Sequence, residues 1–434
     1  MSPPAKPTDP SVWKMRLWIL LGIALLARIS AAVLIEQYVQ QADRSFLVEG
    51  DANGYWILAQ KIAAGEEYSI YTPPRRVLRM PGFPLLLATS IKLFGDSILA
   101  ARIVLAIIGT ACCWLTYCLG KRLHSPAIGF WAAAFVAINP LHIGNSVLIL
   151  SETWFTFWML ISLLALHWML VSSCSASQKD PSNNTTCSDR PGPWRLWLRS
   201  LAVGALIGIT VLVRPGFLPW LGICCFASCV LLRRTWLVRT LLCSGLILGC
   251  VTVLLPWAAR NATVTGHWVF TSLWSGPSLY DGLNPTATGA SDMRFFDDEN
   301  VLSRMTEFEM NQHYKSRAID FALHNPGKTA TLAFQKLAIV LSPVPNFANR
   351  KGWAISAVCV ITWLLLVVSC VTGLKTRQWS TLDLVIMVGP LVQFLLVHMV
   401  FVGSVRYRLP LEFSLVVLAA IGWQQLVQRS PDHA

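Results

Sequence analysis

Apolar runs long enough to cross a lipid bilayer alternate with short polar segments along most of the chain. A membrane-spanning helix needs about 20 mostly apolar residues. Two apolar segments, 82–95 and 328–342, either cross the membrane or lie along its surface. The pattern predicts an all-α polytopic membrane protein with roughly 10 to 13 transmembrane helices. The ten clearest spans lie at residues 16–35, 97–119, 126–140, 146–170, 200–214, 217–232, 240–256, 353–373, 381–402 and 409–427.

Basic residues predict how the chain is oriented in the membrane. Lys121 and Arg122 directly follow the second span, and cytoplasmic loops are enriched in lysine and arginine. With these residues inside, the two longest polar segments lie on the outer face, where each carries interfacial helices. The predicted organisation is a disordered cytoplasmic tail at 1–15 and a single transmembrane domain at 16–434, with outer loops at 36–96 and 257–350 and a cytoplasmic insertion at 172–199.

Composition supports a membrane protein and argues against a nucleic-acid-binding one. The 434 residues are 54% hydrophobic and only 13% charged, with a formal net charge of +13. We attribute this charge to residues that flank spans and face anionic lipid headgroups. The 12 cysteines lie mostly in apolar spans and lack histidines at metal-binding spacing, so neither a disulfide framework nor a metal site is expected. The expected partners are membrane lipids, with no nucleic acid.

The first outer loop concentrates the residues with the most distinctive chemistry. Residues 49–84 contain Asp51, three arginines (Arg75, Arg76 and Arg79) and the turn Pro81-Gly82-Phe83-Pro84. A carboxylate can accept a proton from one substrate, while guanidinium groups hold a phosphate of another. Each has a simpler interpretation as well. Asp51 suits the N-cap of a helix over 53–63, and the arginines suit anchorage to lipid headgroups.

Charged residues inside or beside the spans form a second group of candidates. Glu152 is an intramembrane acid, which is either functional or the partner of a buried arginine such as Arg214. Arg28 either reaches the outer membrane surface or points into the protein toward a phosphate. The segment Arg406-Tyr407-Arg408 is either an interfacial anchor or a clamp on a lipid-linked phosphate. His398 lies on an apolar face and is typical of a packed core residue.

An ordered set of motifs gives these residues a context. The first-loop pattern Gly50-Asp51, Tyr55, Gly65, Tyr68 and Arg79 to Pro84 resembles the first outer loop of the GT-C superfamily of glycosyltransferases. The resemblance is to the bacterial branch related to protein O-mannosyltransferases and lipid A aminoarabinose transferases. Further pieces follow in the same order: Ala101-Arg102, Leu119 to Arg122, Asn139-Pro140, Leu150 to Glu152, Val213 to Pro215, Pro256-Trp257, Arg260-Asn261 and Arg406 to Pro410.

The resemblance implies the GT-C fold and an enzyme of the cytoplasmic membrane whose active site faces the periplasm or exterior. Such enzymes transfer a sugar from a polyprenyl-phosphate carrier to a hydroxyl of a lipid, a glycan or a protein. Asp51 corresponds to their catalytic carboxylate, and no metal or other cofactor is expected. Ala52 and Met80 stand where the O-mannosyltransferases have glutamate and the aminoarabinose transferases have lysine. The candidate substrate-binding residues are Tyr55, Arg75, Arg76, Arg79, Glu152, Arg214, Arg406, Tyr407 and Arg408.

Two other functions compete with this one. A lipid or sugar-lipid transporter or flippase would spread ionisable residues through the middle of several spans. A catalytically inactive scaffold of an envelope-assembly complex would look like the enzyme in sequence. The polar residues are gathered mainly in the outer loops, which favours the inverting glycosyltransferase with Asp51 as general base.

Overall fold

The computed structural model describes residues 10–174, 192–232, 234–344, 353–376 and 379–429, and all regular elements within them are helices. The predictions for residues 1–9 and for most of the insertion at 172–199 lie outside these ranges. Eight of the described helices are long and apolar enough to cross a membrane, which confirms an all-α polytopic membrane protein. They are α1 (Pro10–Gln41), α4 (Ile98–Leu123), α7 (Glu152–Cys174), α8 (Pro193–Val213), α10 (Trp236–Thr265), α15 (Trp353–Thr376), α16 (Thr381–Val400) and α17 (Val405–Arg429).

Three further apolar helices are shorter. A helix of 13 residues is about 20 Å long, whereas the bilayer core is about 30 Å thick. The predicted spans 126–140 and 217–232 therefore correspond to helices that cannot cross a flat bilayer alone. These helices are α3 (Gly82–Phe94), α5 (Pro126–Ile138) and α9 (Pro219–Leu231), the last preceded by a 3₁₀ turn at Pro215–Phe217.

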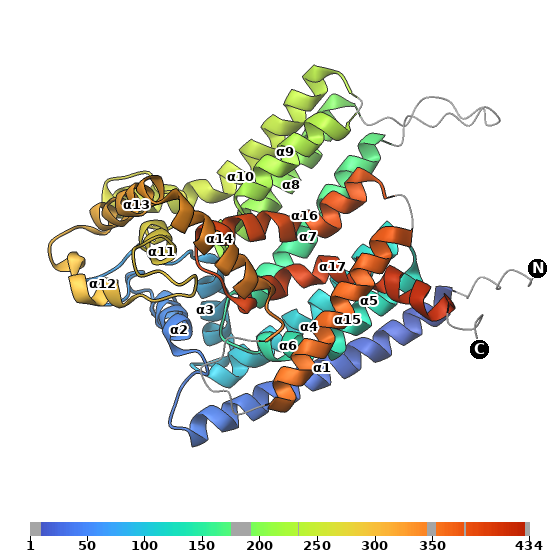
Figure 1. Ribbon diagram of the computed structural model, residues 1–434, viewed down its shortest axis with the longest axis horizontal. Coiled ribbons are helices and arrows are strands. Elements are labelled where there is room, and N and C mark those ends of the chain that lie inside the picture. Colours follow the sequence, from blue (N-terminus) through green and yellow to red (C-terminus); the bar gives the residue numbers. More distant parts are fainter. Residues whose placement is uncertain (1–9, 175–191, 233, 345–352, 377–378, 430–434) are drawn as a thin grey trace, which may run out of the picture.

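The remaining helices gather mainly at one end of the bundle, on the left of Figure 1. The predicted outer loops meet there, because Glu307 accepts hydrogen bonds from the backbone N–H groups of Arg76 and Val77 at 2.9 and 3.0 Å. Both loops therefore lie at the same end of the molecule, as predicted. We call this part the lobe; it consists of α2 (Glu49–Ala64), α3, α11 (Ser275–Gly282), α12 (Arg294–Glu299), a 3₁₀ turn at Val301–Ser303, α13 (Glu307–His324) and α14 (Pro326–Leu341).

Several helix boundaries differ from the predictions, and each difference affects a candidate residue. Helix α1 already begins at Pro10, inside the predicted tail. Helix α7 begins at Glu152 instead of enclosing it, after the short α6 (Pro140–Asn145). Helix α17 begins at Val405, so Arg406 lies in its first turn and not in a loop. Helix α10 continues through Pro256 to Thr265, because neighbouring helices compensate for the hydrogen bond that a proline removes.

Close backbone contact holds α8 and α10 together. A side chain at Gly204 would place its Cβ 2.1 Å from the carbonyl oxygen of Leu246, and one at Gly249 would lie equally close to that of Leu201. Helices inside a membrane associate through such small-residue contacts, because no water is released when apolar surfaces meet in lipid. Helix α8 ends beside the lobe and carries Arg214 at its C-cap.

Arg28 points into the protein, but its partners there are backbone carbonyl groups. Its side chain is fully buried in α1 and donates hydrogen bonds to the carbonyl oxygens of Ala24, Val136 and Ala137. The last two carbonyls lie at the C-terminal end of α5, where backbone oxygens lack helical partners. Arg28 thus fastens α1 to α5.

Candidate active site

Asp51 stands between two arginines from distant parts of the chain. Its Oδ1 accepts a hydrogen bond from Arg79 Nη2 at 2.7 Å, and its Oδ2 accepts one from Arg406 Nη2 at 2.6 Å. The helix α2 begins at Glu49 with Val48 at its N-cap, and Asp51 lies within its first turn. The N-cap interpretation of Asp51 is therefore wrong. The carboxylate instead joins the lobe to the start of α17.

Glu152 extends this arrangement into a chain of alternating charges. Its Oε1 lies 3.1 Å from both Arg406 Nε and Arg214 Nη2. Arg406 is thereby shared between the two carboxylates. Three guanidinium groups face two carboxylates, which leaves one positive charge in a site that is largely shielded from water. A site with this charge favours an anionic ligand.

The paired arginines control the protonation of Asp51. Burial by itself would raise the pKa of this carboxyl group, but the positive charges of Arg79 and Arg406, and their hydrogen bonds, outweigh burial and hold the pKa well below its ordinary value. Asp51 is therefore ionised at neutral pH. A carboxylate held in this way is a weak base until its arginine partners are engaged elsewhere.

Local contacts place Arg79 at this point. The Tyr68 hydroxyl donates to the carbonyl oxygens of Arg79 and Met80 at 3.2 and 3.4 Å. The turn that follows packs against the end of α8, where a Cβ on Gly82 would lie 2.7 Å from the carbonyl oxygen of Leu212. Only glycine permits so close an approach, which brings Arg79 and Arg214 to the same region.

Other contacts place Arg406. Arg408, two residues later, donates to the carbonyl oxygens of Val340 and Ser342 at the end of α14, both at 2.8 Å. Lys336 of the same helix donates to the carbonyl oxygen of Val400 at 2.7 Å. The lobe helix α14 thereby holds the segment between α16 and α17 on both sides of Arg406.

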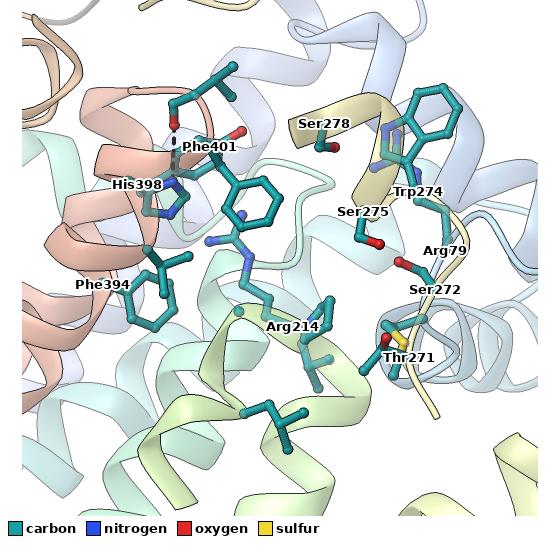
Figure 2. Close-up of a pocket in the computed structure, with 18 of the residues that line it drawn as sticks. Arg79, Arg214, Thr271, Ser272, Trp274, Ser275, Ser278, Phe394, His398 and Phe401 are labelled. Carbon is teal, nitrogen blue, oxygen red and sulfur yellow. Dashed lines mark hydrogen bonds between the residues drawn. The ribbon is translucent and has the colours of Figure 1, made fainter. Parts of the chain in front are cut away.

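A cavity of about 460 Å³ adjoins this network. Figure 2 shows Arg214 reaching between Phe394 and Phe401, with Trp274 and Ser275 on the opposite wall. Two guanidinium nitrogens of residues that line it, Arg79 Nε and Arg214 Nη1, are buried and have no hydrogen-bond partner among the described residues. Because a buried N–H group without a partner is costly, these atoms are suited to a ligand with acceptor oxygens.

Aromatic and hydroxyl side chains complete the cavity. The ring of Tyr55 lies 5.0 Å from the guanidinium group of Arg79, and the ring of Tyr407 lies 5.2 Å from the guanidinium group of Arg214. His398 stacks on Tyr407 with a ring separation of 4.5 Å, and its Nδ1 donates to the carbonyl oxygen of Val402 at 3.0 Å. The sequence did not identify the hydroxyl wall, which consists of Thr271, Ser272, Ser275 and Ser278; its only signal is a run of small hydroxyl residues around Trp274.

Three candidate residues lie outside this network: Arg75, Arg76 and Arg408. Arg75 lies among the rings of Tyr71, Trp274 and Phe296, and Arg76 forms an ion pair with Glu67 near the surface.

Arg408 is fully buried and pairs with Glu412 at 2.7 Å, which in turn contacts His142 at 3.1 Å. Arg408 thus fastens helices to one another, and its contacts do not include Asp51 or Glu152. Among the described residues, no group of three or more His, Cys, Asp or Glu side chains could hold a metal ion; the absence of a metal from the reaction stays a prediction.

Comparisons with known proteins identify the fold. No family model matches the sequence, and no curated protein matches it. The oligosaccharyltransferase of Archaeoglobus fulgidus, tethered to an acceptor peptide, superposes with a TM-score of 0.55 at 14% identity, over 95% of this chain and 50% of that one. The same archaeon's AglB, in complex with an inhibitory peptide and a dolichol-phosphate, superposes with a TM-score of 0.51 at 15% identity, over 95% and 50% of the two chains.

The chain has the GT-C fold. It spans about half the length of the oligosaccharyltransferases that it matches. The ArnT of Cupriavidus metallidurans, bound to undecaprenyl phosphate, aligns over 98% of this chain and 82% of its own at 12% identity, with a TM-score of only 0.44. Within the GT-C fold, the charged network lies where the lobe meets the bundle.

Proposed function

We propose that the protein is an inverting membrane glycosyltransferase that moves a monosaccharide, a hexose or a pentose, from a polyprenyl-phosphate carrier to a hydroxyl group. The acceptor hydroxyl belongs to an envelope lipid, a glycan or a protein, and transfer takes place on the outer face of the cytoplasmic membrane. The observation that carries the proposal is the ionised Asp51 beside a cavity whose walls hold unpaired guanidinium nitrogens.

The cavity suits the parts of such a donor. The unpaired Arg79 Nε and Arg214 Nη1 supply hydrogen bonds to the phosphate. Trp274 and the hydroxyl wall suit the sugar, since an aromatic face packs on the ring and hydroxyl groups exchange hydrogen bonds with it. The apolar residues Leu218 and Val397 on the remaining side suit the first isoprenoid units. The carrier therefore lies with its charge at the network and its chain toward α9 and α16.

Asp51 then acts as general base. The acceptor oxygen attacks the anomeric carbon, its proton passes to Asp51, and the bond from the anomeric carbon to the phosphate oxygen breaks with its electron pair remaining on the polyprenyl phosphate. The arginines neutralise the charge that develops on this phosphate. When they turn to the donor phosphate, Asp51 loses its paired charges and becomes a stronger base. Donor binding thus activates the base.

The test is a transfer assay with the purified protein in detergent. The protein is incubated with a panel of radiolabelled polyprenyl-phosphate sugars and a panel of envelope lipids, glycans and peptides. The proposal expects label to move from one carrier to one acceptor class without added metal. A transporter would show no transfer in detergent, where no compartments exist, and an inactive scaffold would show none under any condition. Absence of transfer over the whole panel would reject the proposal.

A further inference from the structure

A second cavity lies on the other side of the charged network. It has a volume of about 330 Å³ and is formed by the outer part of α1, by α6, by the start of α17 and by the segments that precede α2 and α7. Its walls are apolar apart from Asn145, Ser404 and Arg406. Arg406 therefore borders this cavity and at the same time holds Asp51 and Glu152.

The mouth of the second cavity opens toward lipid. Pro140 in its wall is exposed, and Ile35 and Leu141 are only half-buried. Leu34 of α1, which precedes Ile35, and Ile138, the last residue of α5 and two residues before Pro140, are 64% and 67% exposed. Large apolar side chains exposed at this level of a polytopic protein face the bilayer.

Asp51 stands at the wall between the two cavities. Its Oδ1 is held by Arg79, which lines the main cavity, and its Oδ2 is held by Arg406, which lines the second cavity. Asp51 itself lines neither cavity, but each of its two oxygens is bound to an arginine of a different cavity. A base in this position can receive a proton from a group that enters through the second cavity.

The geometry of inversion requires two separate approaches to the sugar. The incoming oxygen attacks the face of the anomeric carbon opposite to the departing phosphate. The unpaired guanidinium nitrogens belong to residues of the main cavity, so the phosphate lies there. The acceptor must then arrive from the other side of Asp51, where the second cavity is.

We propose that the second cavity, between α1, α6 and α17, is the acceptor site and takes the hydrocarbon chain of a membrane lipid whose headgroup presents a hydroxyl to Asp51. This inference rests on the proposed function and narrows its acceptor to a lipid. The apolar wall binds one acyl chain, while Asn145 and Ser404 contact the headgroup. A soluble peptide would leave this wall unfilled.

Two glycines allow each cavity to be filled separately. Gly144 lines the second cavity and Gly216 lines the main cavity, and a Cβ at either position would meet no atom within 4 Å. Gly144→Leu and Gly216→Leu therefore obstruct one cavity each without a backbone clash. Gly222→Leu is the matched control, because Gly222 is exposed on α9, lines neither cavity and is equally free of neighbours.

The experiment uses two photoreactive lipids in phosphatidylcholine nanodiscs. One is a glucosyl-diacylglycerol with a diazirine in an acyl chain, and the other is undecaprenyl phosphate with a diazirine in its isoprenoid chain. Crosslinked peptides are mapped by mass spectrometry, with and without an excess of the unlabelled lipid. We expect the glycolipid to label residues 141–148 saturably, and Gly144→Leu to reduce this labelling about tenfold. Gly216→Leu and Gly222→Leu should leave it unchanged.

The other outcomes separate this inference from the proposed function. Saturable labelling of residues 141–148 by undecaprenyl phosphate would assign the second cavity to the donor chain and overturn the inference. Glycolipid labelling that no variant reduces would overturn it as well, while undecaprenyl phosphate labelling near Val397 would leave the proposed function standing. If undecaprenyl phosphate labels neither cavity, the proposed function itself fails. Leu141→Trp, at the mouth, replaces Gly144→Leu if that variant does not fold.

Discussion

Arg406 is the residue that joins the two halves of the charged network. It holds Asp51 through one nitrogen and Glu152 through another, and it borders the second cavity. A guanidinium group can do this because its donors form a rigid fork, whereas a lysine ammonium offers a single charge on a flexible stem. Any anion that recruits Arg406 or Arg79 therefore changes the environment of Asp51 at the same time.

Asp51→Asn tests the base directly. The amide keeps the shape of the side chain but cannot accept the proton, so turnover should fall by roughly two to four orders of magnitude. Donor binding should not weaken, because the variant frees Arg79 and Arg406 for the phosphate. Transfer rates and binding of undecaprenyl phosphate measure the two effects. Asp96→Asn, on the exposed surface of the lobe, is the control, and near-normal turnover in Asp51→Asn would remove Asp51 from the mechanism.

The pH dependence should reveal whether the donor frees Asp51. Burial raises the pKa of Asp51, but without donor the two arginines outweigh burial and hold this pKa well below its ordinary value. The carboxylate is the active form, so activity rises with pH through this pKa. Because the bound phosphate draws the arginines away, the acidic limb of kcat should lie at higher pH than that of kcat/KM for the donor. Coincident limbs would show that donor binding leaves Asp51 unchanged.

At the scale of elements, the site depends on helices that carry no candidate residue. Helix α14 fixes the segment around Arg406 through Lys336 and through the carbonyl groups that bind Arg408. Helix α10 fixes α8, whose end carries Arg214, through glycines in backbone contact. At such contacts the two helices are closely packed and leave little space between them. A substitution that makes a side chain larger is therefore poorly tolerated there.

Gly204→Val tests this packing. The valine Cβ would lie 2.1 Å from the carbonyl oxygen of Leu246, so α8 and α10 must separate. Overpacking of a well-packed core costs about 1–3 kcal/mol, and we expect a lower melting temperature in detergent together with reduced transfer. Gly222→Val, at an exposed glycine with no neighbour within 4 Å, should melt like the wild type. Equal melting temperatures for the two variants would contradict the observed contact.

At the scale of the whole molecule, the lobe forms one end of the bundle (Figure 1). The start of α1 and the end of α17 lie at the other end. If the lobe faces the exterior, as the basic residues Lys121 and Arg122 predict, both cavities open near the outer membrane surface. A lipid-linked donor and a lipid acceptor could then reach the site without leaving the bilayer.

Cysteine labelling tests this orientation. The native exposed Cys229 is first replaced by serine, and single cysteines are then placed at the exposed positions Glu66 and Ser303 of the lobe and at Lys121 near the end of α4. An impermeant thiol reagent applied to intact cells should label Glu66→Cys and Ser303→Cys but label Lys121→Cys only after lysis. Labelling of Lys121→Cys in intact cells, with the lobe positions protected, would reverse the predicted orientation.

The helical membrane architecture was predictable from the sequence, because it depends on the length and apolarity of local segments. The sequence also singled out Asp51, Arg79, Glu152, Arg214 and Arg406, because charges beside apolar spans are costly and need a reason. The structure brings these five side chains into one network, and their roles in catalysis and binding stay predictions. Helix boundaries were less predictable. Pro256 sits inside α10, because the surrounding helices outweigh the local preference of proline to end a helix.

The sequence suggested one charged pair, Glu152 with Arg214, which the structure contains. Only the tertiary structure decided which other charges meet. Asp51 and Arg406 are 355 positions apart, and no local pattern distinguishes Arg406, which joins the network, from Arg408, which fastens α17 to α14. The hydroxyl wall around Trp274 and the second cavity are likewise invisible in sequence. Apolarity along a segment reports how that segment interacts with lipid, whereas the pairing of side chains depends on helix packing between segments that are distant in the chain.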